Sequence, residues 1–286
     1  MAGRVVVVTD STAYLPAQAA EDLGITVVPL QVTLEDQSLA EGSEINGERV
    51  ARALQAGQNV TTSRPSPEAF AQTYRRLAED GATAVVSVHL SGDMSGTVDS
   101  ARLAAREVSP AGLDVHVVDS RSMGMGIGFA ALAAARLARA GGTPGAVAQL
   151  AERRSLNASI YFYVDTLEYL KRGGRIGAAQ AWLGSALTIK PLLYLVDGRL
   201  ERLDRVRTTE RAISRLVEVA ALDAKEGDVE VAIHHLAAPA RAQDVAGRLQ
   251  EQVPGLGDVM VSEVGAVVGA HVGPGTVGVV VSPIDG

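Results

Sequence analysis

Short runs of β-branched residues alternate with segments of helical spacing through the first half of the chain. Val5–Thr9, Ile25–Val32, Ala84–Leu90 and Val115–Val118 each have the composition of a buried strand, and helical segments lie between them. This alternation is typical of a parallel sheet whose strands are joined by crossover helices. The sequence therefore predicts an α/β domain with a mostly parallel sheet over residues 1–155.

The pattern changes in the second half. Two strand-like runs, Ile189–Val196 and Arg199–Val206, flank Asp197-Gly198, a dipeptide that favours the type I′ turn of a β-hairpin. Further strands and helices follow, so a hairpin and strand–helix units occur in the same region. We expect a second domain of mixed α/β structure over residues 156–286, with the boundary near residue 155.

Composition excludes several classes of protein. The net charge of −7 disfavours binding to nucleic acid, which needs clustered Lys and Arg. The chain has no cysteine, which excludes disulfides and thiolate metal sites, and its five histidines lack the spacing of a metal site. We find no signal peptide and no run of about 20 apolar residues that could cross a bilayer. These features predict a cytoplasmic protein without a metal.

Two stretches rich in hydroxyl groups follow strand-like runs. They are Thr62-Ser63-Arg64-Pro65-Ser66-Pro67 and Leu90-Ser91-Gly92-Asp93-Met94-Ser95-Gly96-Thr97. The carboxyl edge of the strands is where α/β sheets bind ligands, so we expect Thr62 and Ser95 to face one polar head group. Neither stretch carries a group with obvious chemistry. This favours holding a ligand over transforming one.

His271 is the one histidine that the pattern marks as a site residue. It lies within Gly265–Thr276, a glycine-rich stretch that we expect to form a loop with an unusual backbone path. Arg175 follows Lys171-Arg172-Gly173-Gly174 and therefore lies beyond the end of a predicted helix. Lys171 and Arg172 suit the negative end of that helix, whereas Arg175 is placed to contact an anionic ligand or a partner.

Two other motifs have structural explanations. Asp10-Ser11-Thr12 is a polar turn at a strand end, and ordinary turn hydrogen bonding accounts for it without a ligand. Gly124-Met125-Gly126-Ile127-Gly128 has the wrong spacing for a dinucleotide-binding loop and begins too far beyond its strand. Close helix packing by small residues is the preferred interpretation of these glycines.

Taken in order, the motifs resemble those of the DegV family of lipid-binding proteins. Each is weak alone, but the ordered set spans nearly the whole chain. The matching segments are Thr9-Asp10-Ser11-Thr12, Thr62-Ser63-x-Pro65-Ser66-Pro67, Ser95-Gly96-Thr97 with Ser100-Ala101, Val118-Asp119-Ser120-Arg121-Ser122, Leu167-x-x-Leu170-Lys171-x-Gly173-Gly174-Arg175-Ile176, Lys190-Pro191 and Gly269-Ala270-His271-x-Gly273-Pro274-Gly275.

The resemblance implies a two-domain DegV-like fold that binds a long-chain fatty acid, such as palmitate, in a buried apolar site. Thr62 and Ser95 would hydrogen-bond the carboxylate and His271 would lie beside it. The supporting residues would be Ser63, Gly96, Asp10, Ser11 and Arg175. Asp93 and Met94 depart from the family, which commonly has a serine and a leucine there, and we expect the Asp93 carboxylate to point away from the ligand.

The resemblance also implies a role in phospholipid metabolism as the lipid-binding subunit of a fatty acid kinase. A separate ATP-binding kinase would phosphorylate the presented carboxylate to an acyl phosphate. This chain would then be a binding protein with no catalytic residue and no cofactor, and it would make transient contact with membranes.

Two alternatives come from the same residues. A serine hydrolase could use Ser95, His271 and Asp119, although the chain has no Gly-x-Ser-x-Gly nucleophile elbow. A small-molecule phosphate- or sugar-binding protein could use the glycine-rich and hydroxyl-rich segments. Ester turnover would identify the first, and a clean ligand-free mass without fatty-acid binding would favour the second.

Overall fold

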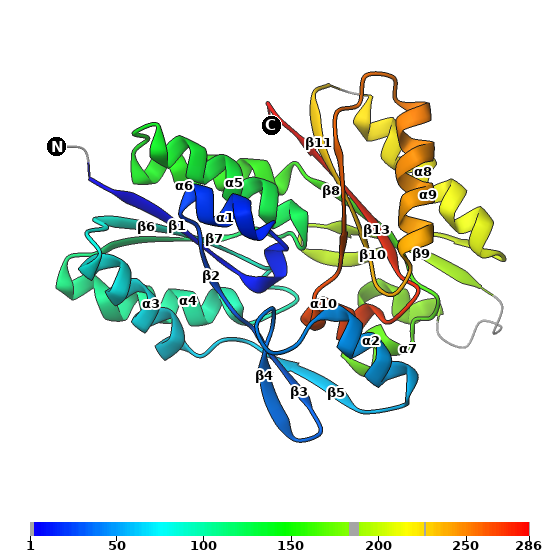
Figure 1. Cartoon of the computed structure of the whole chain (residues 1–286), viewed down its shortest axis with the longest axis horizontal. Helices are drawn as coiled ribbons and strands as arrows, with labels where there is room; N and C mark the ends of the chain where they lie inside the picture. Colours follow the sequence, from blue (N-terminus) through cyan, green and yellow to red (C-terminus); the bar gives the residue numbers. More distant parts are fainter. Residues whose placement is uncertain (1–2, 183–188, 226, 286) are drawn as a thin grey trace. The chain divides into compact units, whose positions relative to one another are not determined.

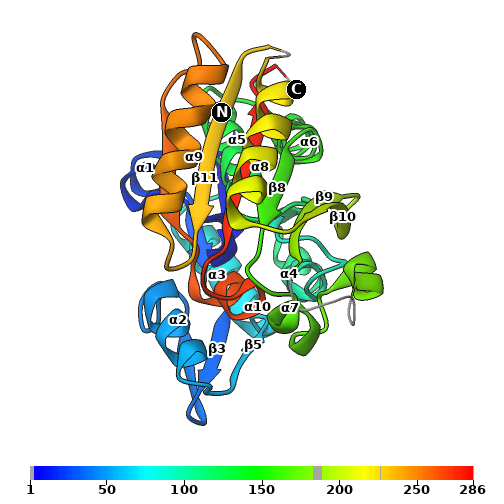
Figure 2. The same ribbon diagram turned by 90° about the vertical axis from the view of Figure 1, so that its right-hand side faces the viewer.

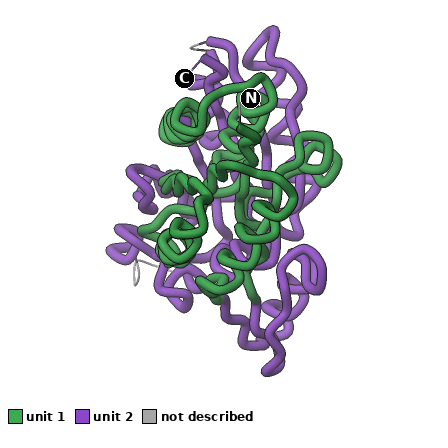
Figure 3. Tube along the Cα trace, turned by 90° about the vertical axis from the view of Figure 1, so that its left-hand side faces the viewer, with its two compact units in different colours: residues 1–31, 63–156 green, residues 32–62, 157–286 purple. Residues whose placement is uncertain are grey.

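The computed structural model describes residues 3–182, 189–225 and 227–285. The chain divides into two compact units, one of residues 1–31 and 63–156 and the other of residues 32–62 and 157–286 (Figure 3). The predicted boundary near residue 155 falls close to the last crossing between the units. The sequence does not predict that residues 32–62 belong with the second half.

The first unit is a parallel sheet between two layers of helices. Its strands follow the order β2-β1-β6-β7, and every pairing is parallel. Helices α3 and α4 pack on one face, where Phe70 and Tyr74 join the valines of the sheet, and α5 and α6 cover the other (Figure 1). The elements are β1 (Val5–Asp10), η1 (Ser11–Ala13), α1 (Ala17–Leu23), β2 (Thr26–Val28), α3 (Pro67–Glu79), β6 (Ala84–His89), α4 (Thr97–Val108), η2 (Ser109–Ala111), β7 (Asp114–Asp119), α5 (Met125–Arg139) and α6 (Pro144–Leu156).

Close packing explains the glycines at the start of α5. A Cβ on Gly128 would lie 2.6 Å from the carbonyl oxygen of Ala13, so only glycine fits without a shift. The interpretation of Gly124–Gly128 as a packing motif is confirmed at this position. The helix begins at Met125, with Gly124 as its N-cap at a φ of 57°.

The expected strand Ile25–Val32 is wrong as a single element. The chain forms β2, then leaves the first sheet at Pro29 and enters β3 (Gln31–Leu34) of a separate three-stranded sheet. Proline lacks the N–H that a continuous ladder needs, which explains the break. Sequence pattern alone cannot distinguish two short strands from one long one when both are apolar.

The second unit is built on a six-stranded mixed sheet of order β10-β9-β8-β13-β11-β12. Its pairings are antiparallel except for β11 with β12, which are parallel. Helices α8 and α9 lie side by side over an aliphatic core (Figure 2). The elements are β8 (Ser159–Tyr163), α7 (Glu168–Arg172), η3 (Gly177–Trp182), β9 (Lys190–Val196), β10 (Arg199–Val206), α8 (Thr209–Ala224), β11 (Val229–His235), α9 (Pro239–Gln252), β12 (Val259–Glu263), α10 (Ala266–Val272) and β13 (Val277–Pro283).

The hairpin predicted around Asp197-Gly198 is confirmed. Strands β9 and β10 pair with Val196 opposite Arg199, and both turn residues have positive φ, 49° at Asp197 and 82° at Gly198. Positive φ at both central positions is the requirement of a type I′ turn. The expected parallel sheet in the first half and mixed sheet in the second are therefore both present.

Residues 32–62 form a segment that packs as part of the second unit. They contribute β3, β4 (Gln37–Ala40) and α2 (Gly47–Gln55), and they end in β5 (Val60–Ser63). The small sheet has the order β4-β3-β5, and α2 packs against α10. Among residues 3–182, 189–225 and 227–285, no helix has the length and apolar character required to cross a membrane.

Candidate functional site

Thr62 and His271 meet within the second unit. The Thr62 side chain lies near the end of β5, and its Oγ1 is 2.8 Å from Nε2 of His271. Both side chains are partly buried. The sequence places both residues at a site, and the structure brings these two together by a direct hydrogen bond. Thr62 lies in a strand of the three-stranded sheet, whereas the sequence predicts that it belongs to a loop.

The glycine-rich stretch around His271 is a helix, which corrects the expected loop. Helix α10 spans Ala266–Val272 and buries every residue but His271, which occupies its last turn. Its apolar residues are short or β-branched and Gly269 lies at its centre, so the pattern did not indicate a helix. Gly269 packs against the side chain of Leu236, where a larger residue would crowd the contact.

Burial keeps His271 neutral. Burial, together with the smaller effect of the nearby Arg175 cation, lowers the pKa of the imidazole from 6.5 to about 4. At neutral pH the ring therefore carries one N–H donor and one nitrogen acceptor. A neutral imidazole beside a hydroxyl can orient that hydroxyl without adding a charge to the site.

Helix α7 fixes the far side of the imidazole. A Cβ on Gly173 would overlap Nδ1 of His271, and a Cβ on Gly273 would overlap the ring of Tyr169. The end of α10 can therefore pack on α7 only because glycine stands at both positions, and Gly273 also has a φ of 77°. This packing explains Gly173, whereas the neighbouring Gly174 has no atom near its Cβ position and a φ of 70°.

Arg175 contacts the turn that ends α7. Its side chain is exposed and donates a hydrogen bond to the carbonyl oxygen of Gly173 at 2.6 Å. Lys171 and Arg172 lie in the last turn of the helix, as the sequence predicts. Arg175 thus acts on His271 through its charge, and its contact with a ligand or partner stays a prediction.

Ser95 belongs to the first unit, in the loop between β6 and α4. Its N–H donates to the carbonyl oxygen of Ser91 at 3.0 Å, and its Oγ is 2.8 Å from Oγ1 of Thr97. Gly96 is the N-cap of α4, and its carbonyl oxygen accepts a hydrogen bond from Arg64 at 3.3 Å. Ser63 and Asp93 are exposed. The loop is held by its own backbone, and the Ser95 hydroxyl remains partly accessible.

Asp10 and Ser11 organise the strand ends of the first unit. The fully buried Asp10 carboxylate accepts hydrogen bonds from the N–H and hydroxyl of Thr12 and from the N–H of Leu90. It also lies 3.0 Å from Nδ1 of His89. Burial opposes ionisation of Asp10, but His89 and the other donors hold its pKa below the ordinary value. The Ser11 hydroxyl accepts from the N–H of Leu30 at 3.0 Å.

The hydrogen bonds from Thr12 to Asp10 are the turn chemistry that the sequence predicts for Asp10-Ser11-Thr12, whereas the contacts with Leu90, His89 and Leu30 reach other segments. The buried network continues from His89 to Ser87 and Tyr74, two residues that the sequence analysis did not single out. A histidine at the end of an apolar strand gives no signal of its buried partner 79 residues earlier.

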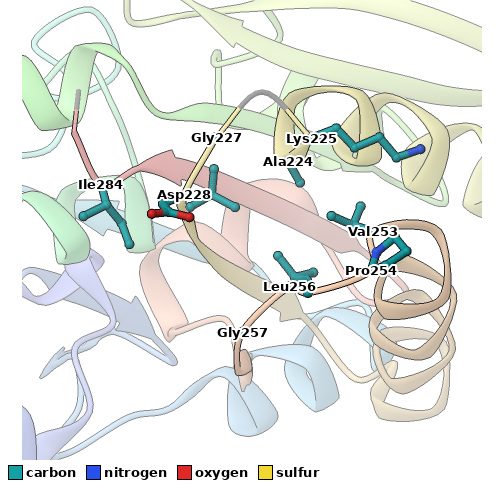
Figure 4. Close-up of a pocket in the computed structure, with 11 residues that line it drawn as sticks. Ala224, Lys225, Gly227, Asp228, Val253, Pro254, Leu256, Gly257 and Ile284 are labelled. Atoms are coloured by element: carbon teal, nitrogen blue, oxygen red, sulfur yellow. The ribbon is translucent and has the colours of Figure 1, made fainter.

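A hollow of about 460 Å³ lies in the second unit beside the ends of α8 and α9 (Figure 4). Val253, Leu256 and Ile284 give it an apolar lining, and the Lys225 side chain extends away from the Asp228 carboxylate. None of the predicted site residues lines it. Its polar side chains do not converge, so we assign no ligand to it.

The described contacts bear on the hydrolase alternative. Ser95 pairs with Thr97, and Nε2 of His271 pairs with Thr62. Asp119 accepts hydrogen bonds from the backbone N–H groups of Gly92 and Arg121. Each residue of the triad that a hydrolase would need is therefore hydrogen-bonded to a group outside that triad.

Comparison with known proteins places the chain in a family. The model of the family described as "Uncharacterised protein, DegV family" matches residues 4–283. A DegV domain-containing protein of Streptomyces coelicolor is 58% identical over 282 residues, which cover 99% of each chain. A second, from Deinococcus radiodurans, is 41% identical over 98% of this chain and 99% of its own.

Solved structures similar to this one belong to the same family. A DegV family protein of Thermus thermophilus, described as fatty acid binding, superposes with a TM-score of 0.91 at 36% identity, covering 98% of this chain and 100% of its own. DegV of Bacillus subtilis, described as a fatty acid binding protein, gives 0.89 at 32% identity, covering 98% and 99%. The chain therefore belongs to the DegV family.

Proposed function

We propose that this protein binds a long-chain fatty acid, such as palmitate, and holds its carboxylate at Thr62 and His271. The observation that carries the proposal is the hydrogen bond between a hydroxyl and a neutral imidazole, both of which are partly buried. The fatty-acid-binding relatives of Thermus thermophilus and Bacillus subtilis support the same ligand class.

The tail and the head group of a fatty acid contribute differently to its binding free energy. Burial of a 16-carbon chain at about 0.8 kcal/mol per methylene gives roughly 12 kcal/mol of gross transfer free energy. A bilayer offers the tail a similar environment, so the tail alone gives little preference for protein over membrane. The head group must therefore add affinity, and a buried carboxylate needs hydrogen-bond donors.

A neutral His271 directs the Thr62 hydroxyl toward such a carboxylate. A hydroxyl has one proton to donate and two lone pairs that accept. If Nε2 carries the imidazole proton, it donates to Thr62 Oγ1, and the threonine proton is left for the ligand. The pair then presents a hydroxyl donor whose direction is set by the ring, and it adds no positive charge that would hold the anion against transfer.

The remaining residues complete the proposal. Ser95 supplies a second hydroxyl to the carboxylate, and Ser63, Gly96, Asp10, Ser11 and Arg175 support the segments around it, as the family resemblance implies. Catalysis and cofactor chemistry reside elsewhere. A separate ATP-binding kinase phosphorylates the presented carboxylate, in the cytoplasm, for use in phospholipid metabolism, and transient membrane contact loads the fatty acid.

Native mass spectrometry of freshly purified protein, followed by lipid extraction, tests the ligand. A co-purified mass in the fatty-acid range supports the proposal. A ligand-free mass combined with no binding on titration with palmitate would refute it.

The kinase step needs a separate experiment. Palmitate-loaded protein is incubated with ATP, with and without a candidate ATP-binding kinase from the same organism, and acyl phosphate is trapped with hydroxylamine. Product should form only with the kinase. Acyl phosphate formed by this chain alone would contradict its role as a binding subunit.

A further inference from the structure

Helix α10 lacks a side-chain cap of its own. Its N-cap is Gly265, which has no side chain to accept a hydrogen bond from the first turn. The acceptor comes instead from a segment 226 residues earlier, because Oε1 of Glu41 accepts a hydrogen bond from the N–H of Val267 at 2.8 Å. The Glu41 side chain is buried, at 6% exposure.

Residues 32–62 therefore hold α10 at both ends. Glu41 binds the first turn of the helix, and Thr62 binds His271 in its last turn. Val267 and His271 are four residues apart, so they lie on the same face, one turn from each other. Just before the helix, Gly47 packs so closely on the carbonyl oxygen of Val264 that a Cβ on Gly47 would overlap it.

This arrangement couples the two hydrogen bonds. A short helix without a local cap frays at its first turn unless its N–H groups find acceptors. A shift of α10 along its axis would move His271 away from Thr62, because the two residues come from different segments. The bond at Glu41 resists that shift.

We infer that Glu41 is a positioning residue for His271: by accepting the Val267 N–H, it sets the register of α10 on residues 32–62 and thereby the contact of His271 with Thr62. The inference rests on the proposed function only where it concerns ligand affinity. The geometry at His271 can be tested without any ligand.

The first experiment measures His271 in the ligand-free protein. Side-chain ¹⁵N spectra of histidine-labelled protein report the tautomer and hydrogen bonding of each ring, and H271N assigns the signal. E41A removes the acceptor, E41D keeps the charge but shortens its reach, and E41Q keeps an acceptor at the same reach. Glu44 is the matched control, since its exposed carboxylate accepts a hydrogen bond from the N–H of Ala40 in its own segment.

We expect E41A and E41D to shift the His271 signal, with E41Q and E44A close to wild type. If E41A fails to fold by circular dichroism, the comparison of E41D with E41Q carries the test. Wild-type His271 signals in E41D, or in a folded E41A, would overturn the inference.

The second experiment measures palmitate affinity in the same variants. We expect E41A to bind about tenfold more weakly, the equivalent of about 1.4 kcal/mol. E41Q and E44A should keep wild-type affinity. Absence of palmitate binding to the wild type would refute the proposed function alone, whereas a normal affinity in E41D with an unmoved His271 signal would refute the positioning role alone.

Discussion

Oγ1 of Thr62 lies 2.8 Å from Nε2 of His271, although 209 residues separate the two in the sequence. The bond joins the end of the segment of residues 32–62 to helix α10. Burial keeps the imidazole neutral, so the threonine hydroxyl is oriented without an added charge.

Replacement of Thr62 by valine should weaken palmitate binding. Valine keeps the shape and the strand preference of threonine but removes the hydroxyl that we propose as the carboxylate donor. Hydrogen bonds to charged groups contribute about 1.5–3 kcal/mol, so the dissociation constant should rise about tenfold or more. Isothermal titration measures it, and T62S should stay near wild type. Equal affinity of T62V and wild type would remove Thr62 from the site.

Ser95 is tested together with Thr62. If both hydroxyls bind one carboxylate, the double variant T62A/S95A should bind palmitate more weakly than either single variant, while circular dichroism and the unfolding transition stay close to wild type. T62A/S66A is the matched control, because the Ser66 hydroxyl caps α3 by accepting from the N–H of Ala69. A double variant no weaker than T62A alone would exclude Ser95 from the head-group site.

Stability should fall in acid through His271. Its pKa is lowered from 6.5 to about 4 in the folded protein, so between these values the unfolded chain binds more protons. The free energy of unfolding therefore rises with pH across this window, and the full contribution of about 3 kcal/mol is present above pH 6.5. His234, whose pKa burial also lowers to about 4, contributes in the same direction.

Urea unfolding of wild type and H271N from pH 4 to pH 7 measures this dependence. The variant should show a shallower rise, because one of the histidines whose pKa is lowered by burial is gone. H116N is the control, since His116 is half-exposed and hydrogen-bonded to Asp114. A pH dependence in H271N as steep as in wild type would show that His271 is not buried in the neutral form.

The Asp10 carboxylate should matter for stability more than any exposed carboxylate of its unit. In D10N the amide nitrogen faces hydrogen-bond donors that now lack an acceptor, which costs about 1–3 kcal/mol. D22N is the control: Asp22 is exposed and accepts from Gln18 on the same helix, so its effect should stay within about 0.5 kcal/mol. Chemical denaturation measures both, and similar losses in the two variants would contradict the buried network.

The sequence predicts local structure well. The type I′ hairpin at Asp197-Gly198 and the turn hydrogen bonds of Asp10 with Thr12 depend on backbone preferences or on hydrogen bonding between near neighbours, which a single sequence displays directly. Thr62 and His271 are each marked as a candidate by their own segment, but neither segment indicates their contact across 209 residues.

The arrangement of residues 32–62 could not be predicted in this way. Their place in the second unit depends on contacts such as Glu41 with Val267, and neither residue carries a signal of a partner 226 positions away. The break at Pro29 and the helix around His271 were missed for a related reason. Apolar strands and short buried helices look alike when valine, alanine and glycine dominate both.

Gly173 and Gly174 offer the sharpest test of the His271 environment, because they are adjacent in the chain and only Gly173 packs against the ring. A Cβ on Gly173 would overlap Nδ1 of His271, whereas a Cβ on Gly174 would meet no atom within 4 Å. Gly174 has a φ of 70°, so G174A costs backbone strain of about 1 kcal/mol without touching the ring. G173A should instead displace the imidazole, break its bond to Thr62 and weaken palmitate binding. Both variants should lose stability in urea, but only G173A should move the His271 ¹⁵N signals, and equal effects of the two on those signals would show that α7 does not hold the ring.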